Sequence, residues 1–351
     1  MNVAVAGLGA WGPNLARNIA VAKGARLHTL CDARPERLAS LARQHPTAKT
    51  SSDLSTVLAD GEVEAVVIAT PVHTHFELAA AALQAGKHVL VEKPLARTSE
   101  QCEELIGLAK RAGLVLMAGH VFIYNAAVRR VKEYIDAGEL GDIYYVYSQR
   151  LNLGQVRQDV NALWNFAPHD LSILGYWLGR DPERVTARGY SYIQLGIEDV
   201  VFITLDFPGG IGANVHISWL DPRKVRCMTV VGSRKMVVYD DVSADARIVV
   251  YDRGVSKKLA QSAPEPLAQS LGQYGSFGEF QLLLRAGDVL IPKLDFVEPL
   301  KVECEHFVDC IRTERSPETD GEAGLRVVRV LEAADRALRH GRPEPIGGAP
   351  A

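Results

Sequence analysis

The sequence has little of several features that mark large classes of protein. Only 5 of its 351 residues are cysteine, an odd number with no Cys-x-x-Cys pair, which argues against a disulfide-stapled fold. No apolar run reaches the roughly 18 residues that a membrane span needs, and the first residues lack the basic stretch of a signal peptide. Lys and Arg (39) nearly balance Asp and Glu (42), without a basic block. We therefore expect a cytoplasmic protein that binds neither nucleic acid nor membrane.

The composition that remains is that of a globular chain. Hydrophobic residues make up 47% of it and charged residues 23%, which excludes a disordered or collagen-like polypeptide. The length is enough for roughly two domains with a core in each.

The first third alternates short apolar runs with helical patterns. The runs lack clean in-out alternation, which is typical of parallel strands covered on both faces. They cover residues 3–6, 27–31, 65–69, 88–91 and 114–118, with helices expected at 76–85 and 100–112. This order predicts an α/β domain over residues 1–122 with a Rossmann-type, doubly wound parallel sheet.

From residue 123 the pattern changes to successive strands. We expect helices at 124–137 and 169–178, and strands at 143–151, 185–192, 200–207, 212–220, 225–232 and 235–239. The turns at 208–210 and 221–222 stand where hairpins would need them, residues 256–274 suggest a long loop, and helices are expected at 300–312 and 321–340. The pattern predicts an α+β domain over 123–351, with a mostly antiparallel open sheet. An open sheet face commonly pairs with another copy, so this domain would bind substrate and form a homodimer or homotetramer.

A glycine-rich turn follows the first expected strand and opens a helix. In Gly7-Leu8-Gly9-Ala10-Trp11-Gly12, the three glycines permit a tight turn, close approach to a pyrophosphate and close helix packing. Asp32 lies 20 positions after Gly12, where its carboxylate can bind the ribose hydroxyls and repel a 2′-phosphate, which favours NAD. Arg34 and Arg37 are close enough to accommodate that phosphate, so NADP stays open. Such a turn also occurs with other ligands, such as S-adenosylmethionine.

Two further elements carry residues suited to proton transfer. Leu90-Val91-Glu92-Lys93-Pro94 ends a buried strand at the ligand-binding edge of the expected sheet, where Lys93 could polarise a substrate oxygen or pair with Glu92. Ala167-Pro168-His169-Asp170 precedes an apolar helix. At the start of that helix the dipole would keep His169 neutral and able to accept a proton, although a His there is often only a cap or a packed residue.

These elements, in this order, resemble those of the Gfo/Idh/MocA oxidoreductase family. The likeness spans nearly the whole chain and rests on the glycine turn, Ala69-Thr70-Pro71-Val72-His73-Thr74-His75, Glu92-Lys93-Pro94, His169 and Asp320-Gly321. Within the family, the chain is similar to the branch that acts on nucleotide-linked sugars, which includes UDP-N-acetylglucosamine 3-dehydrogenase-like proteins. The segments that carry this second likeness are Trp11-Gly12-Pro13-Asn14, Tyr124-Asn125, Leu163-Trp164-Asn165-Phe166-Ala167-Pro168-His169-Asp170 and Ser218-Trp219-Leu220.

The resemblance implies a hydride transfer between a sugar carbon and the nicotinamide ring. Lys93 would contact the reacting hydroxyl and His169 would take its proton, or the two would exchange these roles. Other members often carry an acid four residues before the His, where this chain has Asn165, which cannot relay a proton. The implied cofactor-binding residues are Gly7, Gly9, Ala10, Trp11, Gly12, Asp32, Thr70, Pro71, His75, Glu92 and Lys93.

Several polar residues are candidates for binding a sugar or its diphosphate. Arg150, Asn152 and Arg157 lie in a polar stretch before the His169 helix, which is equally well explained as a solvated loop. Tyr124 and Asn125 begin a helix where the two domains are expected to meet, and Asn165 and His169 complete the substrate-binding set. Cys304, His306 and Cys310 have a spacing that does not converge on a metal, so no metal site is expected.

The leading hypothesis is an NAD-dependent dehydrogenase that oxidises C3 of a nucleotide sugar, most readily a UDP sugar, in biosynthesis. The alternatives are an NAD(P)H-dependent ketosugar reductase and an inositol or polyol dehydrogenase. Two alternatives belong to other classes: an NAD-retaining glycosidase and a non-catalytic NAD-binding regulator. The sequence does not determine the sugar, the nucleotide or the physiological direction.

Overall fold

The computed structural model describes residues 1–154, 157–158, 160–255 and 284–347, and these divide into two compact units. Unit 1 comprises Met1–Ala126, Leu171–Ile173 and Phe296–Arg336. Unit 2 comprises Ala127–Asp170, Leu174–Asp295 and Ala337–Ala351. The loop expected at 256–274 lies outside the described residues.

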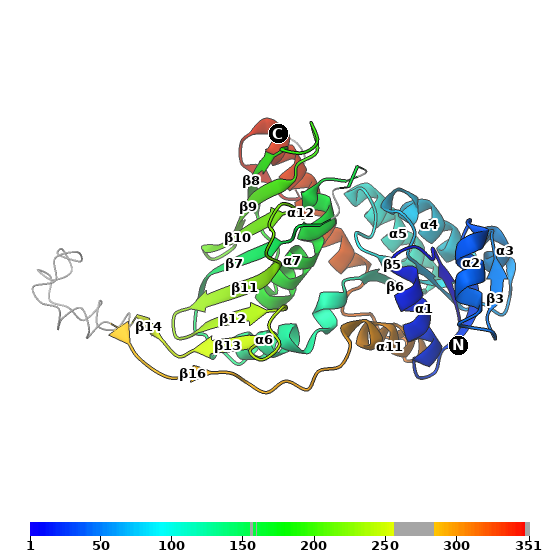
Figure 1. Ribbon diagram of the computed structural model, residues 1–351, viewed down its shortest axis with the longest axis horizontal. Helices are drawn as coiled ribbons and strands as arrows, with labels where there is room; N and C mark the ends of the chain where they lie inside the picture. Colours follow the sequence, from blue (N-terminus) through cyan, green and yellow to red (C-terminus); the bar gives the residue numbers. More distant parts are fainter. Residues whose placement is uncertain (155–156, 159, 256–283, 348–351) are drawn as a thin grey trace, which may run out of the picture. The chain divides into compact units, whose positions relative to one another are not determined.

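Unit 1 contains a six-stranded parallel sheet in the order β3-β2-β1-β4-β5-β6, flanked by helices (Figure 1). The strands are β1 (Asn2–Ala6), β2 (Arg26–Cys31), β3 (Lys49–Ser51), β4 (Ala65–Ile68), β5 (His88–Glu92) and β6 (Leu116–Gly119). Valine, alanine and leucine fill the central strands, whose side chains are almost completely buried because helices cover both faces. The predicted doubly wound sheet is confirmed. The edge strand β3 was not predicted, because its three residues are polar and partly exposed.

The helices of unit 1 come from both ends of the chain. They are α1 (Gly12–Val21), α2 (Pro35–Ala42), α3 (Leu54–Ala59), α4 (His75–Gln84), α5 (Ser99–Ala112), α11 (Pro299–Arg312) and most of α12 (Gly321–His340), with short 3-10 turns η1 (Val72–Thr74) and η2 (Val121–Tyr124). α11 packs against α1 and η2. On α12, Glu332 accepts hydrogen bonds from the backbone N–H (3.0 Å) and hydroxyl (2.7 Å) of Ser99 at the start of α5. The late segment is therefore an integral part of the nucleotide-binding unit.

Unit 2 is built on a nine-stranded sheet in the order β16-β13-β12-β11-β7-β10-β9-β8-β17. The strands are β7 (Ile143–Leu151), β8 (Arg184–Tyr190), β9 (Val200–Phe207), β10 (Ile211–Ser218), β11 (Val225–Gly232), β12 (Met236–Asp240), β13 (Ile248–Tyr251), β16 (Val289–Leu290) and β17 (Glu344–Pro345), beside a separate pair, β14 (Gly254–Val255) and β15 (Leu284–Arg285). Among the described strands of this nine-stranded sheet, only the β7–β10 pair is parallel, which confirms the mostly antiparallel sheet.

One predicted hairpin is confirmed and another is wrong. Phe207 pairs with Ile211 across Pro208-Gly209-Gly210, as expected for a tight antiparallel turn. Asp221-Pro222, in contrast, does not join neighbouring strands, because β10 and β11 lie on opposite sides of β7. Turn residues mark a change of direction, and they do not show which strand the chain will pair with next.

The helix that carries His169 begins earlier than expected. α7 (Ala162–Leu178) starts seven residues before His169, and the side chain of Asn161 caps it by accepting a hydrogen bond from the Trp164 N–H at 3.1 Å. Pro168 lies inside this helix, although prolines more often mark a first turn. His169 is therefore an interior helical residue, and the expected effect of a helix start on its basicity does not apply.

The two faces of the unit 2 sheet differ in what covers them. α6 (Ala126–Asp136) and α7 lie against one face (Figure 1), where Trp177 of α7 donates a hydrogen bond to the Val128 carbonyl and packs edge-on against Tyr239. On the other face aromatic side chains are exposed, with Tyr145 47% and Phe202 40% accessible. The strand alternation that predicted unlike faces is thus confirmed in β9.

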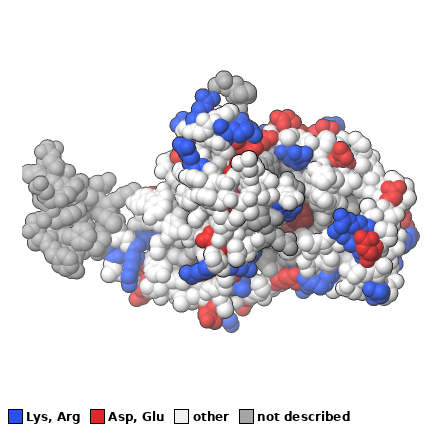
Figure 2. Space-filling model, turned by 45° about the horizontal axis from the view of Figure 1, so that its top comes forward, with Lys and Arg blue, Asp and Glu red and all other residues white. Residues whose placement is uncertain are grey.

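On the face shown in Figure 2, basic and acidic side chains of the described residues are intermixed. Among those residues, no helix combines the length and the apolar character that crossing a membrane requires.

The buried face of β9 should contribute more to the stability of unit 2 than its exposed face. Leu205→Ala removes a fully buried side chain and should lower the free energy of unfolding by about 2–5 kcal/mol. Thr204→Ala, on the exposed face of the same strand, should cost less than about 1 kcal/mol. Urea denaturation of both variants checks this; equal losses would contradict the assigned faces.

Candidate active site

The glycine turn forms a tight cradle between β1 and α1. Gly7 has a φ of +91°, and a Cβ on it would meet the Ala69 carbonyl carbon at 2.6 Å. A Cβ on Gly12 would lie 2.0 Å from the Gly7 carbonyl oxygen. No side chain caps the N-terminus of α1, but Pro13 has no N–H and the Asn14 N–H donates to the Trp11 carbonyl at 3.0 Å, so the backbone donors for a phosphate come from the glycine turn that precedes them. The cradle fits a dinucleotide, which the turn would hold through backbone rather than side chains.

Asp32 stands at the carboxyl end of β2, beside this cradle. Its side chain is only 8% exposed and accepts hydrogen bonds from the backbone N–H of Leu8 at 2.6 Å and of Arg34 at 2.9 Å. The Arg37 guanidinium lies 3.4 Å from the same carboxylate, and it also faces the space above Gly9. The acid is thus fixed in place, with a cation next to it.

The turn after β4 is linked to the turn after β5. The ring nitrogens of the buried His75 lie 2.8 Å from the Pro94 carbonyl and 2.9 Å from the Thr70 carbonyl. Burial lowers the pKa of His75, although both carbonyls favour the charged ring. Pro71 precedes η1 in the same turn. His75 therefore fixes the backbone at Thr70 relative to the backbone at Pro94, the residue after Lys93.

Glu92 and Lys93 end β5 at the carboxyl edge of the sheet, and the Lys93–Pro94 peptide bond is cis. Glu92 Oε2 accepts the Lys93 backbone N–H at 3.2 Å, and the Trp11 side chain of the glycine turn lowers the pKa of this carboxyl group. Oε1 is buried without a hydrogen-bond partner among the described residues. Burial raises the pKa of Glu92 to about 7, against the lowering effect of the Lys93 charge.

Two residues that sequence reasoning missed lie in the same part of unit 1. His120, directly after β6, is 1% exposed, and burial with the charges of Lys93 and Arg326 lowers its pKa to about 4. Glu303 of α11 is completely buried; within the described part of the chain, neither carboxyl oxygen has a hydrogen-bond partner. Burial, and then the charge of Glu92, raises the pKa of Glu303 well above its usual value. A signal existed: Glu303 stands three residues after Leu300 and four before Phe307, on the apolar stripe of its helix.

Tyr124 and Asn125, expected to contact substrate, are both buried in unit 1. The Tyr124 hydroxyl lies 3.0 Å from Thr319 Oγ1, and its ring packs 5.3 Å from that of His306. Their contact with a sugar stays a prediction.

In unit 2, His169 lies next to a buried ion pair. Asp170 of α7 accepts hydrogen bonds from Ser148 Oγ at 2.6 Å and from Arg150 Nε, at about 2.5 Å; both partners are on β7. Arg150 is 5% exposed, and its charge is compensated by Asp170. The pair locks α7 onto the sheet and thereby fixes the backbone that carries His169.

The remaining predicted residues of unit 2 lie near this helix in sequence. Asn165 is half-buried one helical turn before His169. The Asn152 backbone N–H donates to the Ser218 carbonyl at 3.1 Å, and the Arg157 carbonyl accepts a hydrogen bond from Gln194 at 2.9 Å. Contact of these residues with a substrate stays a prediction.

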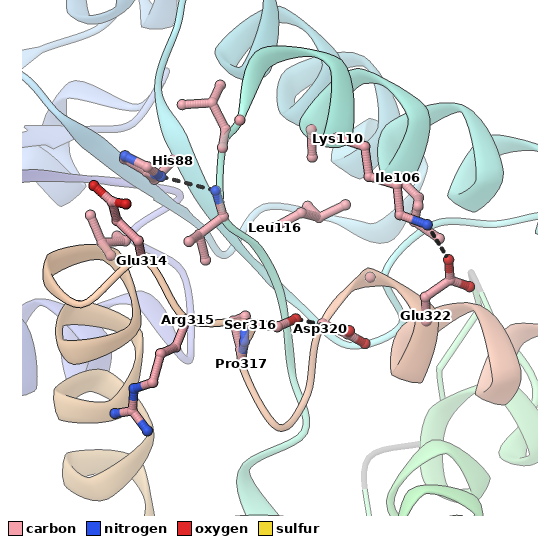
Figure 3. Close-up of a pocket in the computed structure, with 16 residues that line it drawn as sticks. His88, Ile106, Lys110, Leu116, Glu314, Arg315, Ser316, Pro317, Asp320 and Glu322 are labelled. Atoms are coloured by element: carbon pink, nitrogen blue, oxygen red, sulfur yellow. Dashed lines mark hydrogen bonds and ion pairs between the residues drawn. The ribbon is translucent and has the colours of Figure 1, made fainter.

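One pocket of about 490 Å³ lies in unit 1, away from the glycine turn and Glu92. Figure 3 shows it in unit 1, with His88 and Leu116, the first residues of β5 and β6, at its wall. It is therefore at the amino ends of these strands, whereas the glycine turn and Glu92 are at carboxyl ends. Its cations and anions are mixed, and Lys110 is paired with Glu322 at 2.8 Å.

Potential metal ligands converge at one place among the residues that the structure describes. Ligand atoms of His28, Asp60 and Glu62 lie within 4.8 Å of one another. Lys49 already forms ion pairs with Asp60 at 3.1 Å and with Glu62 at 3.0 Å, so its ammonium group supplies the positive charge there.

A doubly wound sheet with a glycine cradle, a fixed acid on β2 and a Lys at the end of β5 defines a dinucleotide-binding oxidoreductase. Residues 1–120 match the sequence model of the Gfo/Idh/MocA oxidoreductase family with an NAD-binding Rossmann fold, and residues 128–238 match the C-terminal domain of that family. The chain belongs to the Gfo/Idh/MocA family.

Individual relatives agree with this assignment. The chain is 30% identical over 227 residues to 4-carboxy-2-hydroxymuconate-6-semialdehyde dehydrogenase of a Sphingobium species, covering 62% of this chain and 72% of the relative. It is 32% identical over 226 residues to inositol 2-dehydrogenase 2 of Saccharopolyspora erythraea, covering 62% and 66%. The structure of UDP-N-acetylglucosamine 3-dehydrogenase from Acidithiobacillus ferrooxidans is similar with a TM-score of 0.79 and 25% identity, covering 97% of this chain and 98% of that one.

The cradle makes a direct prediction about cofactor binding. Gly12→Ala places a methyl group against the Gly7 carbonyl, so the turn must open and NADH affinity should fall at least about tenfold. Gly61→Ala is the matched control, because nothing lies within 4 Å of its Cβ position. Fluorescence titration with NADH measures both; unchanged affinity in the Gly12 variant would show that the cradle is not the binding site.

Proposed function

We propose that this protein is an NAD-dependent dehydrogenase that oxidises C3 of a UDP sugar. The observation that carries the proposal is the likeness, over 97% of the chain, to a structure named UDP-N-acetylglucosamine 3-dehydrogenase. The cradle of Gly7, Gly9 and Gly12 with Asp32 and Lys93 supports the same chemistry from the residues themselves.

NAD rather than NADP is proposed because of Asp32. Its carboxylate is held by two backbone N–H groups, in position to bind ribose hydroxyls. A 2′-phosphate would meet this negative charge. Arg37 partly offsets it, which keeps NADP as the alternative cofactor.

In the proposed reaction the bound cofactor accepts a hydride at its nicotinamide ring. Lys93 contacts the reacting hydroxyl and stabilises the developing alkoxide, and His169 takes the hydroxyl proton. His75 keeps Lys93 in place through the Pro94 carbonyl. Asn165 binds a sugar hydroxyl and relays no proton. Arg150, fixed by Asp170, and Asn152 and Arg157 are the proposed contacts to the nucleotide part of the substrate.

A polyol such as inositol is the second candidate substrate. The 32% identity to an inositol 2-dehydrogenase supports it, because a ring alcohol needs the same Lys and His chemistry without a site for a nucleotide. For either substrate we propose that the exposed aromatic face around Tyr145 and Phe202 pairs with a second copy of the chain.

A substrate panel separates these activities. The purified protein is assayed for bound NAD, and NADH absorbance is followed with UDP-, dTDP- and GDP-sugars and with free polyols. An increase in NADH absorbance with a UDP sugar but with no polyol supports the proposal. An increase with inositol but with no nucleotide sugar supports the second candidate. Product formation without net cofactor change would contradict both and indicate a cofactor-retaining glycosidase.

Lys93 should be needed for turnover but not for cofactor binding. Lys93→Met removes the ammonium group that stabilises the alkoxide, so kcat should fall at least about a thousandfold while NADH affinity changes little. Lys110→Met, at an exposed ion pair, should keep full activity. Steady-state kinetics and NADH titration measure both effects; undiminished kcat would remove Lys93 from the mechanism.

A further inference from the structure

The pocket at the amino ends of β5 and β6 takes no part in the proposed reaction. Its volume of about 490 Å³ is within the range of small-molecule sites. Ile106 and Ala109 of α5 and Leu116 of β6 contribute buried apolar side chains to its lining. The proposed cofactor site is at the opposite, carboxyl ends of the same strands, so an occupant of this pocket would be a different ligand.

The segment that joins α11 to α12 forms another wall of the pocket and is held by the sheet. The Ala118 N–H of β6 donates to the Thr319 carbonyl at 2.7 Å, and Met117 forms an antiparallel bridge with Asp320. Asp320 also accepts the Ala323 N–H at 2.9 Å, at the start of α12. This wall is therefore fixed by backbone contacts, so the pocket is formed before any ligand binds.

Both cationic side chains that line the pocket already have acidic partners. Lys110 is paired with Glu322 at 2.8 Å. Arg315 is paired with Asp309, which does not belong to the lining. His88 adds no positive charge near pH 7, because burial lowers the pKa of its ring. The lining therefore has no cation left to attract an anionic ligand.

Two carboxylates of the lining, Glu314 and Asp320, form no ion pair in the part of the chain that the structure describes. Glu314 is exposed just beyond the last turn of α11, where the negative end of the helix dipole disfavours an anion. It also has a φ of +53°, a conformation that glycine would adopt without strain. Figure 3 shows Glu314 at one end of the pocket and the Lys110–Glu322 pair at the other, with Leu116 between them. Lys110 therefore does not neutralise the charge of Glu314.

We propose that this pocket binds a small organic cation, namely an amine with an apolar body. Its ammonium group is attracted to the wall that carries Glu314 and Asp320, and its apolar part packs against Ile106 and Leu116. The inference goes beyond the proposed function and does not depend on it.

Other classes of ligand fit the pocket less well. An anion would be repelled by the two carboxylates that lack ion pairs, and an uncharged ligand would leave them uncompensated. A metal ion needs several ligand atoms that converge on one point. Among the described residues, the converging group consists of His28, Asp60 and Glu62, and none of these lines the pocket.

The test compares three probe compounds of similar shape and different charge. At about pH 7.5, phenethylamine is a cation, 2-phenylethanol is neutral and 3-phenylpropanoate is an anion. Their Kd values are measured by saturation-transfer NMR titration of the full chain without cofactor. We expect a Kd of about 1 mM or tighter for the amine, a Kd at least about fivefold higher for the alcohol and no saturable binding of the anion. In a separate fluorescence titration, the amine should not displace NADH.

Three variants assign the binding to this pocket. Glu314→Gln removes the negative charge, so it should weaken amine binding about fivefold and leave alcohol binding unchanged. Glu305→Gln removes the same charge from α11 outside the lining and should change neither. Leu114→Trp fills the pocket from a half-buried lining position and should abolish binding of both compounds. Thermal unfolding and NADH titration check that each variant is folded.

Each outcome supports or overturns the site. Preference for the amine that Glu314→Gln weakens and Leu114→Trp abolishes supports it. Equal affinities for amine and alcohol, or no saturable amine binding up to about 20 mM, overturn it. Undiminished amine binding in a folded Glu314→Gln variant, or displacement of NADH by the amine, would place the amine elsewhere and also overturn it. If NADH does not bind, the proposed cofactor site fails, whereas the probe titrations still decide the fate of this pocket.

Discussion

The close approach of Gly7 and Gly12 is the constraint on which the nucleotide-binding unit depends. A side chain at either position would overlap backbone atoms, so the first turn of α1 can lie against β1 only when both are glycine. This approach aims the uncapped N-terminus of α1 at the carboxyl edge of the sheet. The same edge holds Asp32 and Lys93, because parallel strands end on one side. The steric requirement for two glycines thus places the groups suited to bind phosphate, to bind ribose and to assist hydride transfer at one edge of the sheet.

The site of unit 1 is made rigid by polar side chains that never need to touch substrate. His75 joins two carbonyl groups from successive strand ends, and Asp32 is held by two backbone donors. In unit 2, Asp170 has a comparable structural role, because its hydrogen bonds with Ser148 and Arg150 hold α7 against β7. Such contacts fix the backbone from which the functional side chains project. Only a few side chains are then needed to bind and act on the substrate.

Periodicity and glycine spacing predicted the parallel sheet, its binding edge and the antiparallel second sheet, because these depend on local pattern. The errors came where the outcome depends on distant segments. Pro168 indicated a helix start, yet α7 continues on its N-terminal side because Asn161 caps it there. Asp221-Pro222 indicated a hairpin, but β7 occupies the place between the two strands. Glu303 was missed because an acid in an amphipathic helix is ordinarily solvated, and only the fold shows that its face is covered.

The return of the chain to unit 1 has a consequence for its synthesis. α11 and α12 pack in the same unit as β1, so that unit lacks two of its helices until the ribosome has passed residue 336. Until then the surfaces of α1 and η2 that receive α11 are uncovered. The nucleotide-binding unit is therefore complete only after residue 336 has been made, and a product truncated before residue 296 would expose these apolar surfaces to chaperones and proteases.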